Sequence, residues 1–186
     1  MINIKIRLAL YLVVTFVLMS CNMKTYVLKD KITDVPYKPT VYKNKSKFTT
    51  SLINTIDTGV VYEEFDREKN ILMSSDKCTA CRGYRIYKFY PNGCLNMFFF
   101  DRNSLLPTVE FDPLYSGYRG VYYTENNKIR FDLFAEIDQR QHTGKLSATL
   151  TFSGDTMYLK RDDLSYTEIY IKRKLPPEYF VYKANW

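Results

Sequence analysis

The chain has 186 residues, with 27 Lys or Arg against 20 Asp or Glu, which gives a formal net charge of +7. Its length suits a single domain, since domains average ~150 residues. One histidine, His142, leaves little room for Ser-His or Cys-His catalysis, and no phosphate-loop or nucleophile-elbow motif occurs. Composition therefore argues against the common hydrolase and nucleotide-binding classes.

The positive charge is concentrated in one region. Residues 22–47 hold seven lysines and two aspartates, whereas residues 48–186 hold 18 basic and 18 acidic residues. A domain that binds nucleic acid is expected to carry a basic patch on its own surface. The sequence therefore does not favour a nucleic-acid partner.

The stretch "LALYLVVTFVLMSCN" at residues 8–22 is apolar and stops at a cysteine. It is shorter than the ~20 apolar residues that a transmembrane helix needs. Lys5 and Arg7 precede it and the small residue Ser20 lies near its end, as in a secretory signal peptide. We therefore predict that residues 1–20 are a signal peptide; the alternative is a buried helix with an incidental cysteine.

Residues 18–21, "LMSC", resemble the lipobox of bacterial lipoproteins. The resemblance implies that the Cys21 thiol is acylated with diacylglycerol and becomes the N-terminus of a membrane-anchored mature chain. Signal cleavage without lipidation is the alternative. No acidic residue follows Cys21 in "NMKT", and the analogy with Bacteroidetes-type lipoproteins then favours the periplasmic face of the outer membrane.

Residues 21–47 show no sustained hydrophobic period and contain Pro36 and Pro39. We predict a flexible, basic tether, which would have a root-mean-square span of ~28 Å. Its lysines either contact anionic headgroups, at up to ~1 kcal/mol each, or simply keep the tether solvated. Residues 48–186 would then form a single domain.

Alternation of apolar and polar residues with period two dominates the rest of the chain. It is clearest in "NKIRFDLFAEID", where Asp132, Glu136 and Asp138 are expected on the solvated face. A helix is expected only over residues 49–58. Eight strands are predicted, over residues 59–66, 83–90, 94–101, 117–124, 127–138, 144–152, 156–161 and 166–173.

Strands in hairpin succession with one apolar face form a meander, which loses its exposed edges when it closes on itself. We predict an all-β fold, an antiparallel up-and-down barrel of about eight strands; a two-sheet β-sandwich is the alternative. The arrangement resembles the lipocalin and calycin barrels over residues 58–174, although the Gly-x-Trp sequence of lipocalins proper is absent near the first strand. The resemblance implies binding of a small ligand.

A barrel of this size is just wide enough for one small ligand or for its own side chains. Most residues expected inside are large, so we expect a filled interior with binding confined to the mouth. The predicted interior residues, and candidate ligand contacts, are Leu95, Met97, Phe99, Phe131, Leu133, Leu150 and Phe152.

Three cysteines remain for chemistry in the mature chain. In an oxidising envelope we predict a disulfide between Cys78 and Cys81. Cys94 lies across a predicted hairpin, ~30 Å from Cys81 at strand rise, whereas a bridge needs Cα atoms within ~7 Å. Cys94 is therefore predicted to be a buried free thiol. Zinc would need these thiols and His142 to converge from distant loops, so we expect neither a metal site nor a cofactor.

The sequence thus predicts a non-enzymatic cell-envelope lipoprotein that binds a small apolar ligand. Its expected partners are the membrane, through the lipid and the lysine-rich tether, and that ligand or an envelope protein. The alternatives are an interaction subunit with an exposed aromatic surface, and an enzyme or thiol redox protein.

Overall fold

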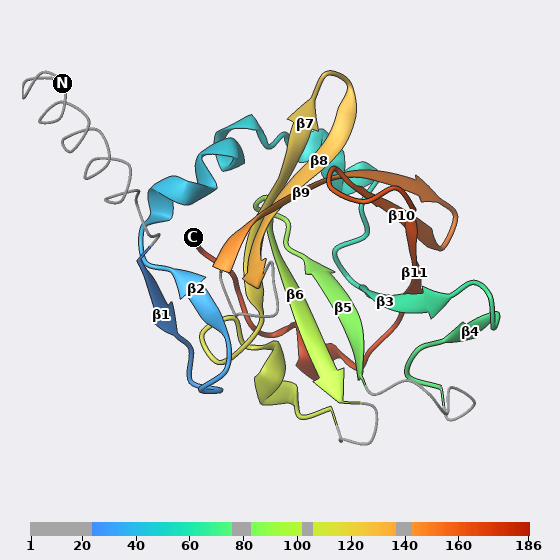
Figure 1. Cartoon of the computed structure of the whole chain (residues 1–186), viewed down its shortest axis with the longest axis horizontal. Coiled ribbons are helices and arrows are strands. Elements are labelled where there is room, and N and C mark those ends of the chain that lie inside the picture. The colour runs from blue at the N-terminus through green and yellow to red at the C-terminus, as the bar shows by residue number, and fades with distance from the viewer. Residues whose placement is uncertain (1–23, 76–82, 102–105, 137–142) are drawn as a thin grey trace, which may run out of the picture.

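A computed structural model describes residues 24–75, 83–101, 106–136 and 143–186 of the chain (Figure 1). Strands dominate this part of the chain, and its helices are short 3₁₀ turns. The 3₁₀ helices are η1 (Pro39–Lys47), η2 (Thr50–Asn54), η3 (Thr108–Phe111) and η4 (Pro177–Phe180). None of them is long and apolar enough to cross a membrane.

Eight antiparallel strands close into a barrel. The order of the sheet is β11-β10-β9-β8-β7-β6-β5-β3-β4, and β11 also pairs with β3, which closes the ring and leaves β4 as an extra strand. The strands are β3 (Val61–Asp66), β4 (Ile71–Leu72), β5 (Gly83–Phe89), β6 (Cys94–Asp101), β7 (Tyr118–Glu125), β8 (Lys128–Glu136), β9 (Thr143–Ser153), β10 (Thr156–Arg161) and β11 (Glu168–Arg173).

The predicted barrel is confirmed, and the sandwich alternative is excluded by the pairing of β11 with β3. Each predicted strand is present, and its bounds differ from the prediction by at most two residues. The hairpin turns explain this agreement. Gly93, Asn126, Asn127 and Gly154 have positive φ angles at the turns of the β5–β6, β7–β8 and β9–β10 hairpins, where Gly and Asn are favoured.

The helix predicted over residues 49–58 is smaller than expected. Only η2, residues 50–54, is helical, and it is a 3₁₀ turn. Thr and Ile dominate the predicted stretch, and β-branched residues lose rotamer freedom in an α-helix. The segment instead closes one end of the barrel, with Leu52 and Ile56 buried in the barrel core.

The predicted flexible tether differs most from the structure. Residues 24–47 form β1 (Thr25–Val27), β2 (Asp34–Pro36) and η1, and they pack on the outer face of β7 and β8. Tyr42 of η1 is 4% exposed and contacts Phe134 of β8 edge to face, with ring centroids 5.2 Å apart. The prolines do not break this structure, since Pro39 occupies the first position of η1, where a missing N–H costs nothing.

The outer face of β5 and β6 is also buried. Phe100 of β6 stacks with Phe111 of η3, and Phe98 packs against the same ring at a tilt. Tyr179 of η4 meets the Phe111 ring edge to face at 5.2 Å. The segment after β11 thus covers these strands from outside. Burial on both faces explains why "CLNMFFFD" is apolar at most positions and does not alternate.

The cysteine predictions have different outcomes. Cys94 is a buried free thiol, as predicted. Cys21 and the proposed Cys78–Cys81 pair lie outside the described residues, so lipidation and the disulfide stay predictions.

Candidate functional site

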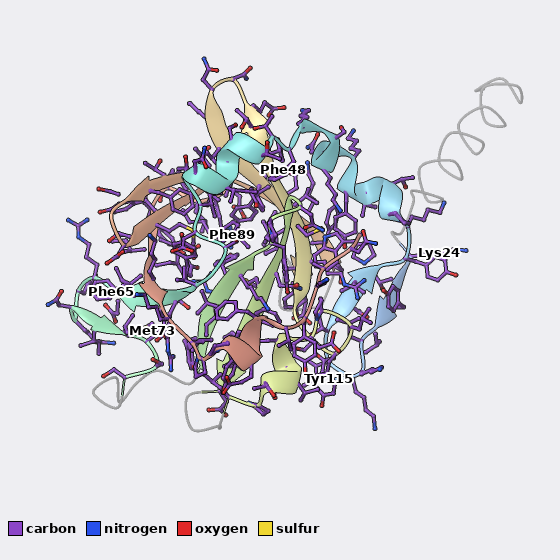
Figure 2. All side chains as sticks on the ribbon, turned by 180° about the vertical axis from the view of Figure 1, so that it is seen from behind. Lys24, Phe48, Phe65, Met73, Phe89 and Tyr115 are labelled. Carbon is purple, nitrogen blue, oxygen red and sulfur yellow. The ribbon has the colours of Figure 1, made fainter. Side chains whose placement is uncertain are left out.

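The two ends of the barrel interior are packed differently. The end near η2 is filled by aromatic rings, with Tyr122 between Phe48 and Phe89 at centroid distances of 5.3 and 5.2 Å. Figure 2 shows Phe48 and Phe89 at this end. At the other end, where β5 begins and β6 ends, a cavity of about 660 Å³ remains. The expectation of a filled interior therefore holds for one half of the barrel only.

The barrel wall of this cavity is mainly apolar. Met97, Phe131, Leu133 and Ala135 of β6 and β8, with Leu146 of β9, line it. These are inner-face positions, which continue the packed core of the filled end. A volume of this size lies within the ~300–1,000 Å³ typical of small-molecule sites.

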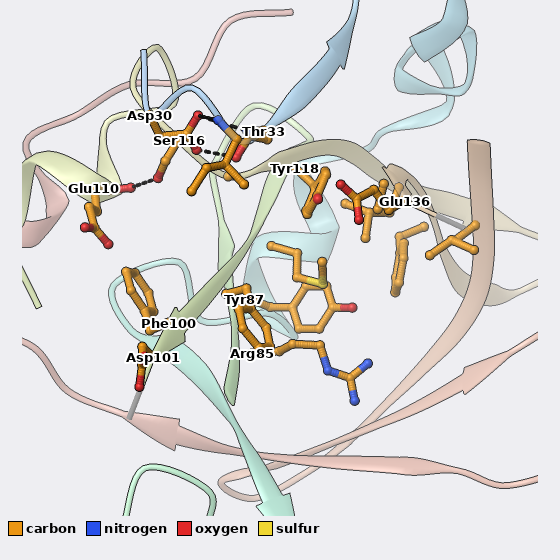
Figure 3. Close-up of a pocket in the computed structure, with 18 of the residues that line it drawn as sticks. Asp30, Thr33, Arg85, Tyr87, Phe100, Asp101, Glu110, Ser116, Tyr118 and Glu136 are labelled. Atoms are coloured by element: carbon orange, nitrogen blue, oxygen red, sulfur yellow. Dashed lines mark hydrogen bonds between the residues drawn. The ribbon is translucent and has the colours of Figure 1, made fainter. Parts of the chain in front are cut away.

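The cavity extends sideways between β6 and β7. These strands pair only from Cys94 to Met97 on β6, so Phe98–Asp101 continues without β7 beside it. The turn between β1 and β2 lies next to this gap, because Asp30 N–H donates to the Tyr115 carbonyl at 3.0 Å. We call this part of the cavity the second lobe; Figure 3 shows Asp30, Thr33, Ser116 and Glu110 near one another there, with Phe100 below Glu110 in the view.

An ionic cluster borders the cavity inside the barrel. Arg85 of β5 contacts Glu64 of β3 through Nε and Nη2, at 3.1 and 2.5 Å, and Nη2 also lies 2.8 Å from Glu168 of β11. Its guanidinium stacks over the Tyr170 ring at 5.9 Å. Burial alone would lower the pKa of Arg85, but the Glu64 hydrogen bonds and adjacent negative charges raise it above its usual value. Arg85 therefore stays charged and fixed.

Carboxylates line the rest of the cavity. Asp30, Asp101, Glu110 and Glu136 reach it, whereas the cationic residues that line it within the described part of the chain are Arg85 and Arg161. Burial, together with repulsion from Asp30, raises the pKa of Glu110. Burial and the adjacent Glu136 carboxylate likewise raise the pKa of Tyr118.

The structure divides the predicted interior residues into two groups. Met97, Phe99, Phe131 and Leu133 line the cavity, while Leu95, Leu150 and Phe152 belong to the filled core. Phe99 is not an interior residue, because it is 64% exposed at the rim. It follows Met97 on the same face, but there β6 has already passed the end of its pairing with β7.

Sequence reasoning missed two kinds of lining residue. Asp30, Ile32 and Thr33 belong to the segment taken for a tether, and nothing local in the sequence signals their position. Arg85 and Arg161 could have been found, because they fall on the inner face in alternation with Tyr87 and Leu159. A charge on an apolar face marks a site where the interior is not simply packed.

Comparison of the chain with models of known protein families, with curated proteins and with solved structures gave no match. Within the described ranges, no group of three or more His, Cys, Asp or Glu side chains is placed to hold a metal ion.

Proposed function

We propose that this protein is a non-enzymatic ligand-binding protein of the bacterial cell envelope, anchored by a lipid on Cys21, on the periplasmic face of the outer membrane. The observation that carries the ligand-binding part is the cavity of about 660 Å³ with an apolar wall at one barrel end. Packed interiors rarely leave voids larger than a water molecule. An apolar cavity of this size is the default candidate for a binding site.

The rim supports the same proposal. Ile32 and Phe99 line the entrance and are 76% and 64% exposed. Exposed apolar side chains next to a cavity extend its apolar surface outward, where a ligand first makes contact.

Ligand binding is tested with the neutral apolar fluorophore N-phenyl-1-naphthylamine. We expect saturable fluorescence with the purified protein and loss of most of it in Ala135→Phe or Leu146→Phe, whose larger side chains fill the cavity. Thr151→Phe adds the same ring on the exposed outer face of β9 and is the control. Equal binding by all folded variants, judged by circular dichroism, would exclude the cavity as the site.

The anchor is tested separately. Cells supplied with labelled palmitate should incorporate it into the wild type and not into Cys21→Ala, and the wild type should fractionate with membranes. A wild type that stays in the aqueous fraction without label would reject the anchor and leave the binding proposal untouched.

An interaction subunit is the second candidate, favoured by the β1–β2 hairpin. Tyr26, Val27 and Tyr37 there are 39%, 55% and 69% exposed, and the two tyrosine rings touch with centroids 6.1 Å apart. Crosslinking in membranes that captures a partner in the wild type but not in Val27→Asp/Tyr37→Asp would favour this candidate.

A further inference from the structure

We propose that the cavity selects amphiphilic cations: an apolar body lies against the barrel wall and a protonated amine lies in the lobe beside Glu110. This inference rests on the proposed ligand-binding function and specifies its ligand class. It follows from the charges around the cavity together with the shape of its two lobes.

The apolar lobe supplies the seat for the body of the ligand. Met97 of β6, Phe131 and Leu133 of β8, and Leu146 of β9 face it. Removing apolar ligand surface from water contributes ~25 cal/mol per Å². This contribution does not depend on the charge of the ligand, so it sets affinity without setting selectivity.

Selectivity comes from the sign of the surrounding charge. Among the residues that the structure describes, four carboxylate residues and two arginines line the cavity. The arginines are already neutralised, since Arg85 pairs with Glu64 and Glu168, and Arg161 pairs with Asp163 at 2.5 Å. No lysine is among the described lining residues. An anionic headgroup would therefore meet carboxylates without an unpaired cation.

Glu110 is the carboxylate best placed for a cationic headgroup. Asp30 is already used within its own turn, where it accepts hydrogen bonds from the backbone N–H groups of Ile32 and Thr33, both at 2.9 Å. Among the described residues, no hydrogen-bond or ion-pair partner is found for the Glu110 carboxylate. Its backbone is held in place, because Ser116 Oγ donates to the Glu110 carbonyl at 2.5 Å.

The environment of Glu110 favours a cation. The carboxylate lies beside Phe100 in the second lobe (Figure 3). Partial burial and the charge of Asp30 destabilise its ionised form, and the opposite charge of a bound cation would favour that form.

The experiment compares three ligands that share a twelve-carbon chain and differ only in the headgroup: dodecylamine, dodecanol and dodecanoate. Each competes with N-phenyl-1-naphthylamine for the purified full chain at pH 7 and low salt. We expect dodecylamine to bind at least about tenfold more tightly than dodecanoate, which corresponds to ~1.4 kcal/mol. Dodecanol should lie between them.

The outcomes separate the two proposals. Absence of N-phenyl-1-naphthylamine binding would reject the ligand-binding function, whereas displacement of the bound fluorophore by none of the three ligands would reject only the amphiphilic ligand class. If dodecanol displaces the fluorophore and dodecanoate binds as tightly as dodecylamine or more tightly, the cation preference is rejected and the ligand-binding function is kept. Raising the salt concentration should weaken the binding of dodecylamine more than that of dodecanol, because screening acts only on the charge interaction.

A substitution at Glu110 tests whether the cationic headgroup of the ligand lies beside this residue. Glu110→Gln should weaken dodecylamine several-fold and leave dodecanol unchanged, because the substitution removes the charge and keeps the shape. Glu68→Gln removes an exposed carboxylate in the β3–β4 turn and is the matched control. An equal loss of amine affinity in both variants would show that the preference is a general effect of net charge and would overturn the role of Glu110.

Discussion

Asn44 donates a hydrogen bond from Nδ2 to Asp132 Oδ2 at 2.6 Å, which joins η1 to a carboxylate that is only 2% exposed on β8. Ser147 Oγ donates to the other oxygen of the same carboxylate at 2.7 Å. Asp132 was expected on a solvated face, and by alternation it does point outward. It is nevertheless buried, because η1 covers that face of the barrel.

Asn44→Ala should lower the free energy of unfolding by about 2 kcal/mol, since it leaves a buried acceptor without one of its donors. Urea denaturation followed by circular dichroism measures the change. Lys43→Ala, on the exposed side of η1, should stay within ~0.5 kcal/mol of the wild type. Equal stability of all three proteins would mean that η1 does not pack on the barrel in solution.

Arg85→Met should destabilise the barrel by about 3 kcal/mol, because Glu64 and Glu168 would lose their shared cation while remaining largely buried. Arg161→Met should cost less than ~1 kcal/mol, since the side chain of its partner Asp163 is 55% exposed. Urea unfolding at pH 7 compares the two. Similar losses of stability in the two variants would contradict the role of Arg85 as the shared cation of two buried carboxylates.

Lys88 provides a prediction of pH dependence. It lies on the outer face of β5, 2% exposed, and donates to the Tyr179 carbonyl at 2.8 Å. Burial lowers its pKa to about 8, below the ~10.4 of an unfolded chain. Between these values the unfolded chain binds the proton and the folded protein does not, so the contribution of Lys88 to stability rises with pH.

Lys88→Met removes this titration and keeps the apolar stem. The stability of the wild type relative to Lys88→Met should therefore increase from pH 8 to pH 10, and it should be flat from pH 6 to pH 7. The difference in unfolding free energy between the two proteins cancels the contribution of the tyrosines, which titrate in both. A difference that falls as the pH rises would contradict the lowered pKa.

The cysteines give a prediction for mass spectrometry. The Cys94 thiol is buried, with Sγ 3.8 Å from the Trp186 carbonyl oxygen. It should resist iodoacetamide in the folded protein and react after denaturation. Non-reduced peptides should show Cys78 linked to Cys81, and a peptide that links Cys94 to either of them would contradict both the pairing and the free thiol.

Most of the barrel could be predicted because its strands and turns are determined by neighbouring residues in the sequence. Alternation set the face of each strand, and the turn residues at Gly93, Asn126 and Gly154 set where each strand ends. Closure followed from the number of strands and their hairpin succession. Local pattern could not reveal that residues 24–47 and the segment after β11 pack on the outside of the barrel. Trp186, for example, donates a hydrogen bond of 2.8 Å to the carbonyl of Gly120, 66 residues away.

The site was predicted only on its barrel side. Met97, Phe131 and Leu133 followed from alternation, but the second lobe depends on the contact between Asp30 and Tyr115. That contact joins a turn near the start of the chain to the segment before β7, and no period or motif encodes such a pairing. The gap between β6 and β7 that admits this lobe is likewise a property of register, which the sequence pattern does not fix.

The packing of residues 24–47 on the barrel bears on the proposed anchor at Cys21. A free stretch of 26 residues would let the domain range over tens of ångströms, whereas here the first described residue, Lys24, already leads into β1. Three residue steps from Cys21 span at most ~11 Å. A lipid on Cys21, as proposed, would therefore hold the barrel close to the headgroups and restrict its orientation. Under that proposal, ligand exchange would take place at the bilayer surface and not in the open periplasm.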